Sequence, residues 1–435
     1  MKGIFYKWCS KVALFVFITT IAGSLSMSAK EVTIGKLKYK VNTTDKIAKC
    51  SGLAEEPTKN YNLVIPNTVE YNGVTLKVTA VEKDAFWFDN YLKKVTLSDY
   101  TETIGSRAFA SCDNISIVSL GKKLKIIGSE AFAHCGNNGT FTSVNLPSSV
   151  EIIRDHAFMD CRSLVSVTLG DKVQSIGDYG FWNCEALTSF IFPGSLNSIG
   201  EMAFASCDAL YEVSFKSGNG KTVIGAKCFD NLKSLAVVNF LGPGVAEIGP
   251  SAFINCRIEW LSLPTSVHTV GEAAFCSNRL TFLELTEGLK IIGDYAFEDQ
   301  YGVGLRALDI PSSVTSIGKH AFYSVGELET IQCKALTPPA YGEEAFSINP
   351  LRFADLWVPQ ASLPLYLKAS GWKEFYHINN VATSVELIET ETIESEEEWF
   401  DLRGNCINPE NISAGIYIVR RGESVVKRVI SSIQK

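Results

Sequence analysis

Cysteine is the reactive residue type with the most regular spacing in this chain. The sequence contains twelve cysteines, and six of them follow a phenylalanine by three residues. Side chains repeated in this way could form disulfides, bind a metal or lie together as buried thiols. The six residues are Cys112, Cys135, Cys161, Cys184, Cys207 and Cys256.

The pattern favours free thiols over disulfides or a metal site. If the six cysteines stack about 4.8 Å apart, parallel side chains give an unfavourable disulfide torsion, although the Cα separation would permit a bond. A zinc site needs four converging ligands, which a ladder along one axis does not supply. We therefore predict buried free thiols, no metal and no cofactor. The equivalent position elsewhere holds Asp89, Leu232, Asn278, Gln300, Val325 and Asn349, so pairing is not required.

Histidine and the usual catalytic motifs give no enzyme signal. His156 and His320 both stand two residues before a repeated phenylalanine, where other copies carry Arg107, Glu130 or Met202. A position that varies so widely is typical of a solvent-exposed surface. The chain has no Gly-x-Ser-x-Gly elbow, phosphate loop or His-Glu-x-x-His motif. We expect a protein that is not an enzyme.

A repeat must position these residues. The phrase Ile-Gly-x-x-x-Phe returns about every 22 to 26 residues, and such a period predicts a solenoid in which each coil buries its apolar face against its neighbours. The expected fold is a β-rich repeat solenoid with short helical turns, a parallel stack of about twelve coils. The repeated phenylalanines are Phe86, Phe109, Phe132, Phe158, Phe181, Phe204, Phe229, Phe253, Phe275, Phe297, Phe322 and Phe346.

Each coil follows the same internal order. A run of the form apolar-x-x-Val-x-Leu, as in Leu164 to Leu169, predicts a short strand with one buried face. Val-x-x-Ile-Gly then predicts a second extended piece. Its glycine stands four residues before the phenylalanine in ten of twelve copies, and we expect it to adopt a turn conformation that a β-carbon would obstruct. The phenylalanine rings should stack into one spine.

The segments outside the repeat divide the chain further. Residues 1–29 are typical of a secretory signal peptide, since the apolar run is short for a membrane anchor. Residues 30–80 are expected to form an N-terminal β cap, 81–346 the solenoid and 347–381 a C-terminal cap. An acidic linker over 382–398 precedes a small β tail, 399–435, in which 415–419 and 425–430 predict a hairpin.

One stretch of the strand face could bind a partner. The residues on either side of the central Val of each strand should point outward, and most of them are small and polar. Val237, Trp260 and Phe282 break this pattern and would form a contiguous apolar patch, a feature of partner sites. Alternatively, a cap or loop covers the patch, or the alternation is shifted by one residue. The acidic residues near the patch are Glu259, Glu284 and Asp309.

The repeat resembles the BspA-like, treponemal-type leucine-rich repeat. The strings Ser175–Cys184 and Leu146–Val150 carry the resemblance, which covers roughly residues 64 to 378. The resemblance implies a right-handed parallel solenoid in a secreted or surface-attached bacterial protein. Some family members bind host matrix proteins such as fibronectin and fibrinogen, or mediate co-aggregation. The tail from Phe400 to Ile430 is similar to a type IX secretion sorting module.

We therefore expect an exported, non-enzymatic protein that binds a macromolecular partner, a protein, through one solenoid face. The partner could be a host extracellular-matrix protein or the surface of another cell. The alternative is a carbohydrate-binding or structural component of the cell envelope. A net charge of −7 argues against nucleic acid. Membrane contact is expected only through the signal peptide or surface attachment, and the oligomeric state stays open.

Overall fold

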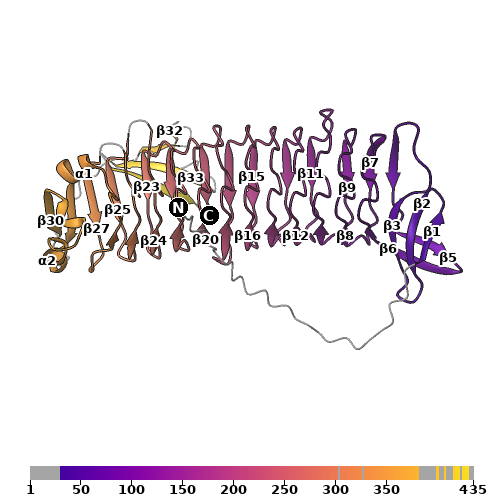
Figure 1. Cartoon of the computed structure of the whole chain (residues 1–435), viewed down its shortest axis with the longest axis horizontal. Coiled ribbons are helices and arrows are strands. Elements are labelled where there is room, and N and C mark those ends of the chain that lie inside the picture. Colours follow the sequence, from indigo (N-terminus) through magenta and orange to yellow (C-terminus); the bar gives the residue numbers. More distant parts are fainter. Residues whose placement is uncertain are drawn as a thin grey trace, which may run out of the picture.

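The computed structural model of the protein describes residues 30–301, 304–325, 328–381, 398–400, 406–407, 415–421 and 424–430. Across the first three ranges the chain winds into an elongated stack of coils (Figure 1). The prediction of a β-rich repeat solenoid is confirmed. The expected signal peptide, and the acidic linker up to residue 397, lie outside the described residues. Among the helices that are described, none has the length and apolar character needed to span a membrane.

One sheet runs the length of the stack. It contains sixteen strands, and from β6 to β28 each coil adds one short strand in parallel. In sheet order the strands are β1 (Lys30–Ile34), β2 (Leu37–Asn42), β3 (Ile47–Leu53), β6 (Val74–Val81), β8 (Thr103–Ile104), β10 (Ile126–Ile127), β12 (Ile152–Ile153), β14 (Ser175–Ile176), β16 (Ser198–Ile199), β18 (Thr222–Ile224), β20 (Val245–Ile248), β22 (Thr269–Val270), β24 (Ile291–Ile292), β26 (Ser316–Ile317) and β28 (Ala340–Tyr341), with β5 (Thr68–Tyr71) pairing β6.

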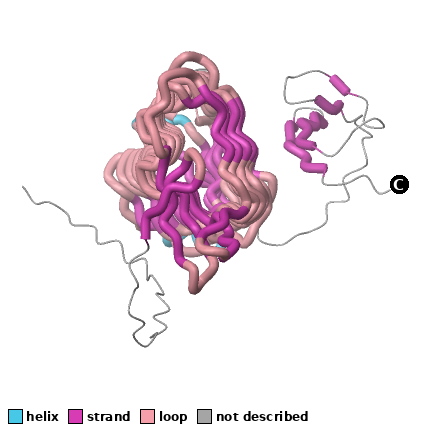
Figure 2. The backbone as a smooth tube through the Cα atoms, turned by 90° about the vertical axis from the view of Figure 1, so that its right-hand side faces the viewer, coloured by secondary structure: helices cyan, strands magenta, loops and turns pink. Residues whose placement is uncertain are grey.

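The apolar-x-x-Val-x-Leu strands lie on another side of the stack, in five shorter parallel sheets. Viewed along the stack, the strands and turns of successive coils superimpose (Figure 2). The sheets are β4 (Tyr61–Val64), β7 (Leu92–Thr96) and β9 (Ile117–Ser119); β11 (Ser143–Asn145) and β13 (Ser166–Thr168); β15 (Ser189–Phe192), β17 (Glu212–Phe215) and β19 (Val237–Phe240); β21 (Trp260–Ser262) and β23 (Phe282–Glu284); and β25 (Ala307–Ile310), β27 (Thr330–Cys333), β29 (Asp355–Pro359) and β30 (His377–Val381).

The repeated phenylalanines form a continuous aromatic spine inside the stack, as predicted. From Phe86 to Phe346, every neighbouring pair of rings is stacked, with centroids 4.8 to 5.5 Å apart. All twelve side chains are buried. The spine is therefore the common core to which each coil contributes one ring.

The glycine four residues before each phenylalanine does not adopt the turn conformation that we expected. None of these ten glycines has a positive φ. They are required instead because the preceding coil approaches closely: a β-carbon on Gly271 would lie 2.8 Å from the backbone of Gly249, and one on Gly342 would lie 2.3 Å from that of Gly318. The amide of Gly271 donates to the carbonyl of Ile248 at 2.8 Å, which draws the two coils together.

Non-glycine residues supply the left-handed conformation. In each coil the residue two before the phenylalanine, and in all but the last coil the residue two after it, has φ between 48° and 62°. The expected short helical turns around the phenylalanines are therefore hydrogen-bonded turns, such as that from the Ala108 amide to the Gly105 carbonyl at 3.2 Å. The described helices are α1 (Ile348–Phe353), α2 (Leu363–Tyr366) and two short 3₁₀ segments, η1 (Gln360–Ser362) and η2 (Trp372–Glu374).

Different structures cover the two ends of the stack. At the N-terminal end, β1, β2 and β3 form an antiparallel meander that continues into the long sheet. At the C-terminal end, Trp372 packs over Phe346 and its indole N–H donates to the carbonyl of Pro339 at 2.8 Å. Both ends of the core are thus covered.

The tail forms a separate antiparallel sheet in the order β32-β31-β33-β34. The predicted hairpin is confirmed, since β33 and β34 pair antiparallel along their whole length. The bounds are β31 (Glu398–Phe400), β32 (Cys406–Ile407), β33 (Gly415–Arg421) and β34 (Ser424–Ile430).

Candidate partner-binding site

The exposed strand surface has the phase that the sequence predicts. On β21 the Trp260 side chain is exposed and Leu261 is buried, and on β23 Phe282 is partly exposed while Leu283 is buried. A strand places alternate side chains on opposite faces, so Trp260 and Phe282 point away from the core. Trp260 keeps 39% of its surface accessible, a large fraction for a tryptophan.

Trp260 and Phe282 form one aromatic unit, called here the aromatic pair. They lie directly opposite each other in the β21–β23 register, and their rings stack with centroids 5.1 Å apart. This arrangement fixes both side chains before any partner arrives, so little rotamer entropy remains to be lost on binding. Val237 occupies the equivalent position on β19, where it is half-buried and faces Glu212 in register.

The three predicted acidic residues differ in their contacts. Glu259 is exposed and directly precedes Trp260. Glu284 accepts a hydrogen bond from the hydroxyl of Ser262. Asp309 forms an ion pair with Lys334 at 2.9 Å. Asp309 is therefore partly neutralised.

The cysteine ladder has a hydrogen-bonding role that the sequence interpretation did not assign. Each of the six thiols lies near the carbonyl of the spine phenylalanine in the preceding coil, as Cys112 does with Phe86 at 3.2 Å. In two coils without the cysteine, a side-chain amide takes the place of the thiol. Asn278 donates to the carbonyl of Phe253 at 2.8 Å, and Gln300 donates to the carbonyl of Phe275 at 2.9 Å. In these eight coils the position therefore supplies a donor to a buried carbonyl.

The ladder thiols are inert groups. All ten cysteines with described side chains are free and buried. Burial raises the pKa of Cys161 and of Cys256 to about 12. A thiol that stays protonated at neutral pH is a poor nucleophile and a poor metal ligand. No cluster of three metal-binding side chains occurs among the residues that the structure describes.

Comparison with known protein families identifies this repeat. The BspA type leucine rich repeat region matches in six copies, over residues 66–142, 136–256 and 246–359. The chain belongs to the BspA-type leucine-rich repeat family. The comparison with curated proteins found no match.

Several solved structures are similar to this BspA-type chain. A leucine-rich repeat protein from Bacteroides ovatus is 23% identical, with a TM-score of 0.42, and the match covers 81% of this chain and 100% of that one. A leucine rich cell surface protein from Faecalibacterium prausnitzii is 21% identical, with a TM-score of 0.40, and the match covers 82% and 96%. The pneumococcal vaccine antigen PcpA is 16% identical, with a TM-score of 0.41, and the match covers 82% and 100%.

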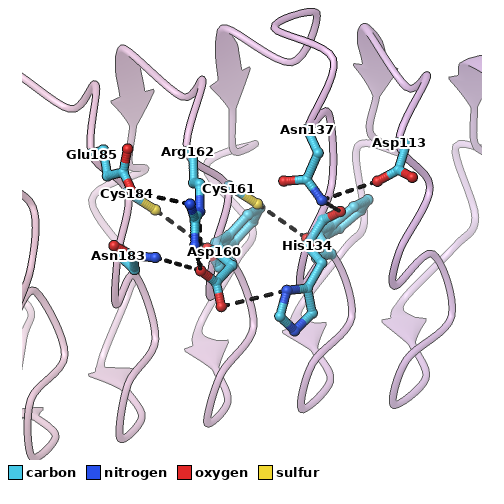
Figure 3. A network of polar contacts seen from close by, with 11 residues as sticks. Asp113, His134, Asn137, Asp160, Cys161, Arg162, Asn183, Cys184 and Glu185 are labelled. Atoms are coloured by element: carbon cyan, nitrogen blue, oxygen red, sulfur yellow. Dashed lines mark hydrogen bonds and ion pairs between the residues drawn. The ribbon is translucent and has the colours of Figure 1, made fainter.

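A network of polar side chains links the turns of neighbouring coils in this BspA-type stack. Asp160 is 7% exposed and lies between His134 at 3.4 Å and Arg162 at 3.4 Å, while Asn183 donates to it from the next coil (Figure 3). Arg162 also reaches Glu185 at 3.4 Å. Because these charged and amide groups are used between coils, the network fastens the turns together.

The two histidines predicted to be exposed are only partly so. His156 stacks on Tyr179 with ring centroids 5.0 Å apart. His320 is 21% exposed, and its imidazole lies between Glu298 at 3.2 Å and Glu344 at 3.1 Å. Both residues occupy the left-handed position, with φ of 59° and 52°. The residue type at this position varies because the side chain is partly exposed, whereas the backbone conformation is the same in every coil.

A second group of exposed aromatics was missed in the sequence. Trp87, Phe88 and Tyr91 follow the first spine residue and are 54%, 64% and 43% exposed. Phe88 has φ of 62°, an unfavourable conformation for a bulky side chain. The sequence does contain a signal for this group. The position two residues after the spine phenylalanine holds Ser, Asn, Asp or His in every coil from Ser111 to Ser324, and Phe88 departs from this pattern.

Proposed function

We propose that this protein is an exported, non-enzymatic BspA-type repeat protein that binds a protein partner through the aromatic pair Trp260 and Phe282. The observation that carries the proposal is the in-register stacking of two large, solvent-facing aromatic rings. Tryptophan is enriched among the residues that dominate binding energy at protein interfaces. Export is supported by the signal-like composition of residues 1–29.

The charge around the aromatic pair supports a protein partner. The surrounding acidic side chains, Glu259, Glu284 and Asp309, would complement a basic rim on the partner. Val237 and these three acidic residues extend the proposed site around the aromatic pair.

The test is a binding assay with paired double variants. Trp260→Ala with Phe282→Ala should weaken binding to immobilised fibronectin or fibrinogen at least tenfold, because truncating a residue that dominates an interface costs about 2 kcal/mol or more, which is about 30-fold in affinity. The matched control is Ile117→Ala with Ile191→Ala, which truncates two apolar side chains, 48% and 56% exposed, at other outward-facing positions of β9 and β15. This control should bind normally.

Two outcomes would contradict the proposal. Unchanged binding by a folded Trp260→Ala, Phe282→Ala variant would remove the aromatic pair from the interface. Binding to glycans in an array, with none to either protein, would favour the carbohydrate-binding alternative instead. Circular dichroism and thermal unfolding of both double variants establish that the fold is intact.

A further inference from the structure

A cavity of about 420 Å³ lies where the last coil meets the C-terminal cap. Its walls come from the turn after β28, from α1 and from the segment that leads into η2. The volume falls within the range of about 300–1,000 Å³ that is usual for small-ligand sites. The cavity lies on a different part of the chain from the aromatic pair.

Two tyrosine rings line this cavity in fixed positions. Tyr341 packs against Gly371, which has φ of 78° and where a β-carbon would lie 2.1 Å from the ring. Trp372 meets the same ring edge-on, with centroids 5.5 Å apart. Tyr323 stacks on the imidazole of His320, with centroids 4.6 Å apart. Neither ring therefore needs to reorganise to receive a ligand.

Three carboxylates also line the cavity. Glu343 pairs with Lys319 at 2.7 Å, and this hydrogen bond holds the pKa of Glu343 below its ordinary value, so the group is ionised at neutral pH. Glu344 contacts the imidazole described above. Glu374 is exposed and lies 3.9 Å from Lys373. Three carboxylates line the cavity, and no lysine or arginine does.

We propose that this cavity binds an organic cation, an ammonium or guanidinium group on a short alkyl chain. Tyrosine faces attract cations through the ring quadrupole, and the carboxylates of Glu344 and Glu374 can accept the charged N–H groups. The group could be the lysine or arginine side chain of a partner protein, or a free amine. The proposal does not depend on the aromatic pair, because it rests on different residues.

Calorimetric titration of the purified protein tests the proposal. The probes are N-acetyl-arginine amide and its neutral isostere N-acetyl-citrulline amide. The arginine probe should bind, and Glu344→Gln with Glu374→Gln should weaken binding at least tenfold while keeping the shape of the site. Glu329→Gln is the matched control, because Glu329 is an exposed glutamate paired with Arg306 at 3.3 Å outside the cavity. This control should leave the affinity unchanged.

Further measurements separate the outcomes. Trp260→Ala with Phe282→Ala should leave cation binding intact, so failure of one proposal is distinguishable from failure of the other. A Gly-Arg-Gly peptide that binds at least as tightly as the blocked amino acid assigns the cavity to a protein side chain, whereas binding of free arginine alone assigns it to a small amine. Equal binding of the citrulline probe, or no binding of any arginine probe to the folded protein, overturns the proposal.

Discussion

Single side chains in the stack matter through the hydrogen bonds they provide to the next coil. Thr222 is 4% exposed, and its hydroxyl donates to the carbonyl of Leu196 at 2.6 Å. Ser195 and Ser313 do the same for Val173 and Leu289, at 2.7 and 2.8 Å. A buried carbonyl that loses its donor retains the full cost of leaving water. These three hydroxyls, at or just before strands β18, β16 and β26 of the long sheet, are therefore structural.

A pair of threonine substitutions isolates this effect. Thr101 is fully buried, and its hydroxyl has no hydrogen-bond partner among the residues that the structure describes. Thr101→Val should thus leave stability unchanged or raise it by up to about 1 kcal/mol, whereas Thr222→Val should lower it by about 1–2 kcal/mol. Urea unfolding midpoints of the two variants give the comparison. An equal loss of stability in both would contradict the assignment.

At the scale of the coil, backbone proximity decides which glycines are essential. Gly271 lies against the backbone of Gly249 and Pro250, whereas Gly180 occupies a position that is alanine in most other coils. A β-carbon on Gly180 would meet the Ile176 side chain at 2.9 Å and the carbonyl oxygen of Gly177, in the same turn, at 3.1 Å. Other coils place alanine after the same Ile-Gly pair, as Ala108 and Ala131 show. The two glycines differ in role although both belong to the repeat.

The same substitution at these two glycines should have opposite effects. Gly271→Ala should destabilise the protein by about 1–3 kcal/mol, because the coils must separate to admit the methyl group. Gly180→Ala should be neutral or stabilising by about 0.4–1 kcal/mol, because alanine restricts the unfolded chain. Thermal unfolding of the two variants checks this. A stable Gly271→Ala protein would show that the coil interface is not tightly packed.

Periodicity made the coil predictable, but the conformations within it were not. The regular spacing of Phe and Leu identifies the buried position of each coil. The aromatic spine and the outward direction of Trp260 could therefore be predicted from the sequence. The left-handed conformation could not be predicted, because the residues that adopt it, such as Met202 and Tyr179, are not glycines. The surrounding structure holds them at a positive φ. The cavity beside Tyr341 combines residues from the last coil and the cap, which no repeat pattern relates.

The whole molecule combines many equivalent buried groups, so small effects add along the stack. Ten buried thiols illustrate this. Desolvation favours the protonated thiol in the folded state, and the pKa of Cys161 and of Cys256 rises from 9.0 to about 12. Between about pH 9 and pH 12 the unfolded chain has therefore released protons that the folded chain still holds. Stability falls as the pH rises through this window.

Alkaline unfolding should report these thiols. Cys161 and Cys256 each contribute a slope of about 1.4 kcal/mol per pH unit between the pKa of the unfolded thiol and that of the folded one. Cys161→Ala with Cys256→Ala should make the loss of stability between pH 9 and 11 shallower than in the unmodified protein, whatever its effect at pH 7. Unfolding midpoints measured across that range give the slope. An unchanged slope would mean that the thiols titrate alike in both states.

The hydrogen bonds of the long sheet run along the axis of the stack, from β1 to β28. Tension applied between the two ends of the solenoid would pull these bonds along their own length, instead of shearing them in parallel. Coils would then unfold from an end one at a time, and each would add more than twenty residues of extended chain. A protein of this kind, held between two surfaces, would yield by lengthening in steps and would keep its remaining coils folded.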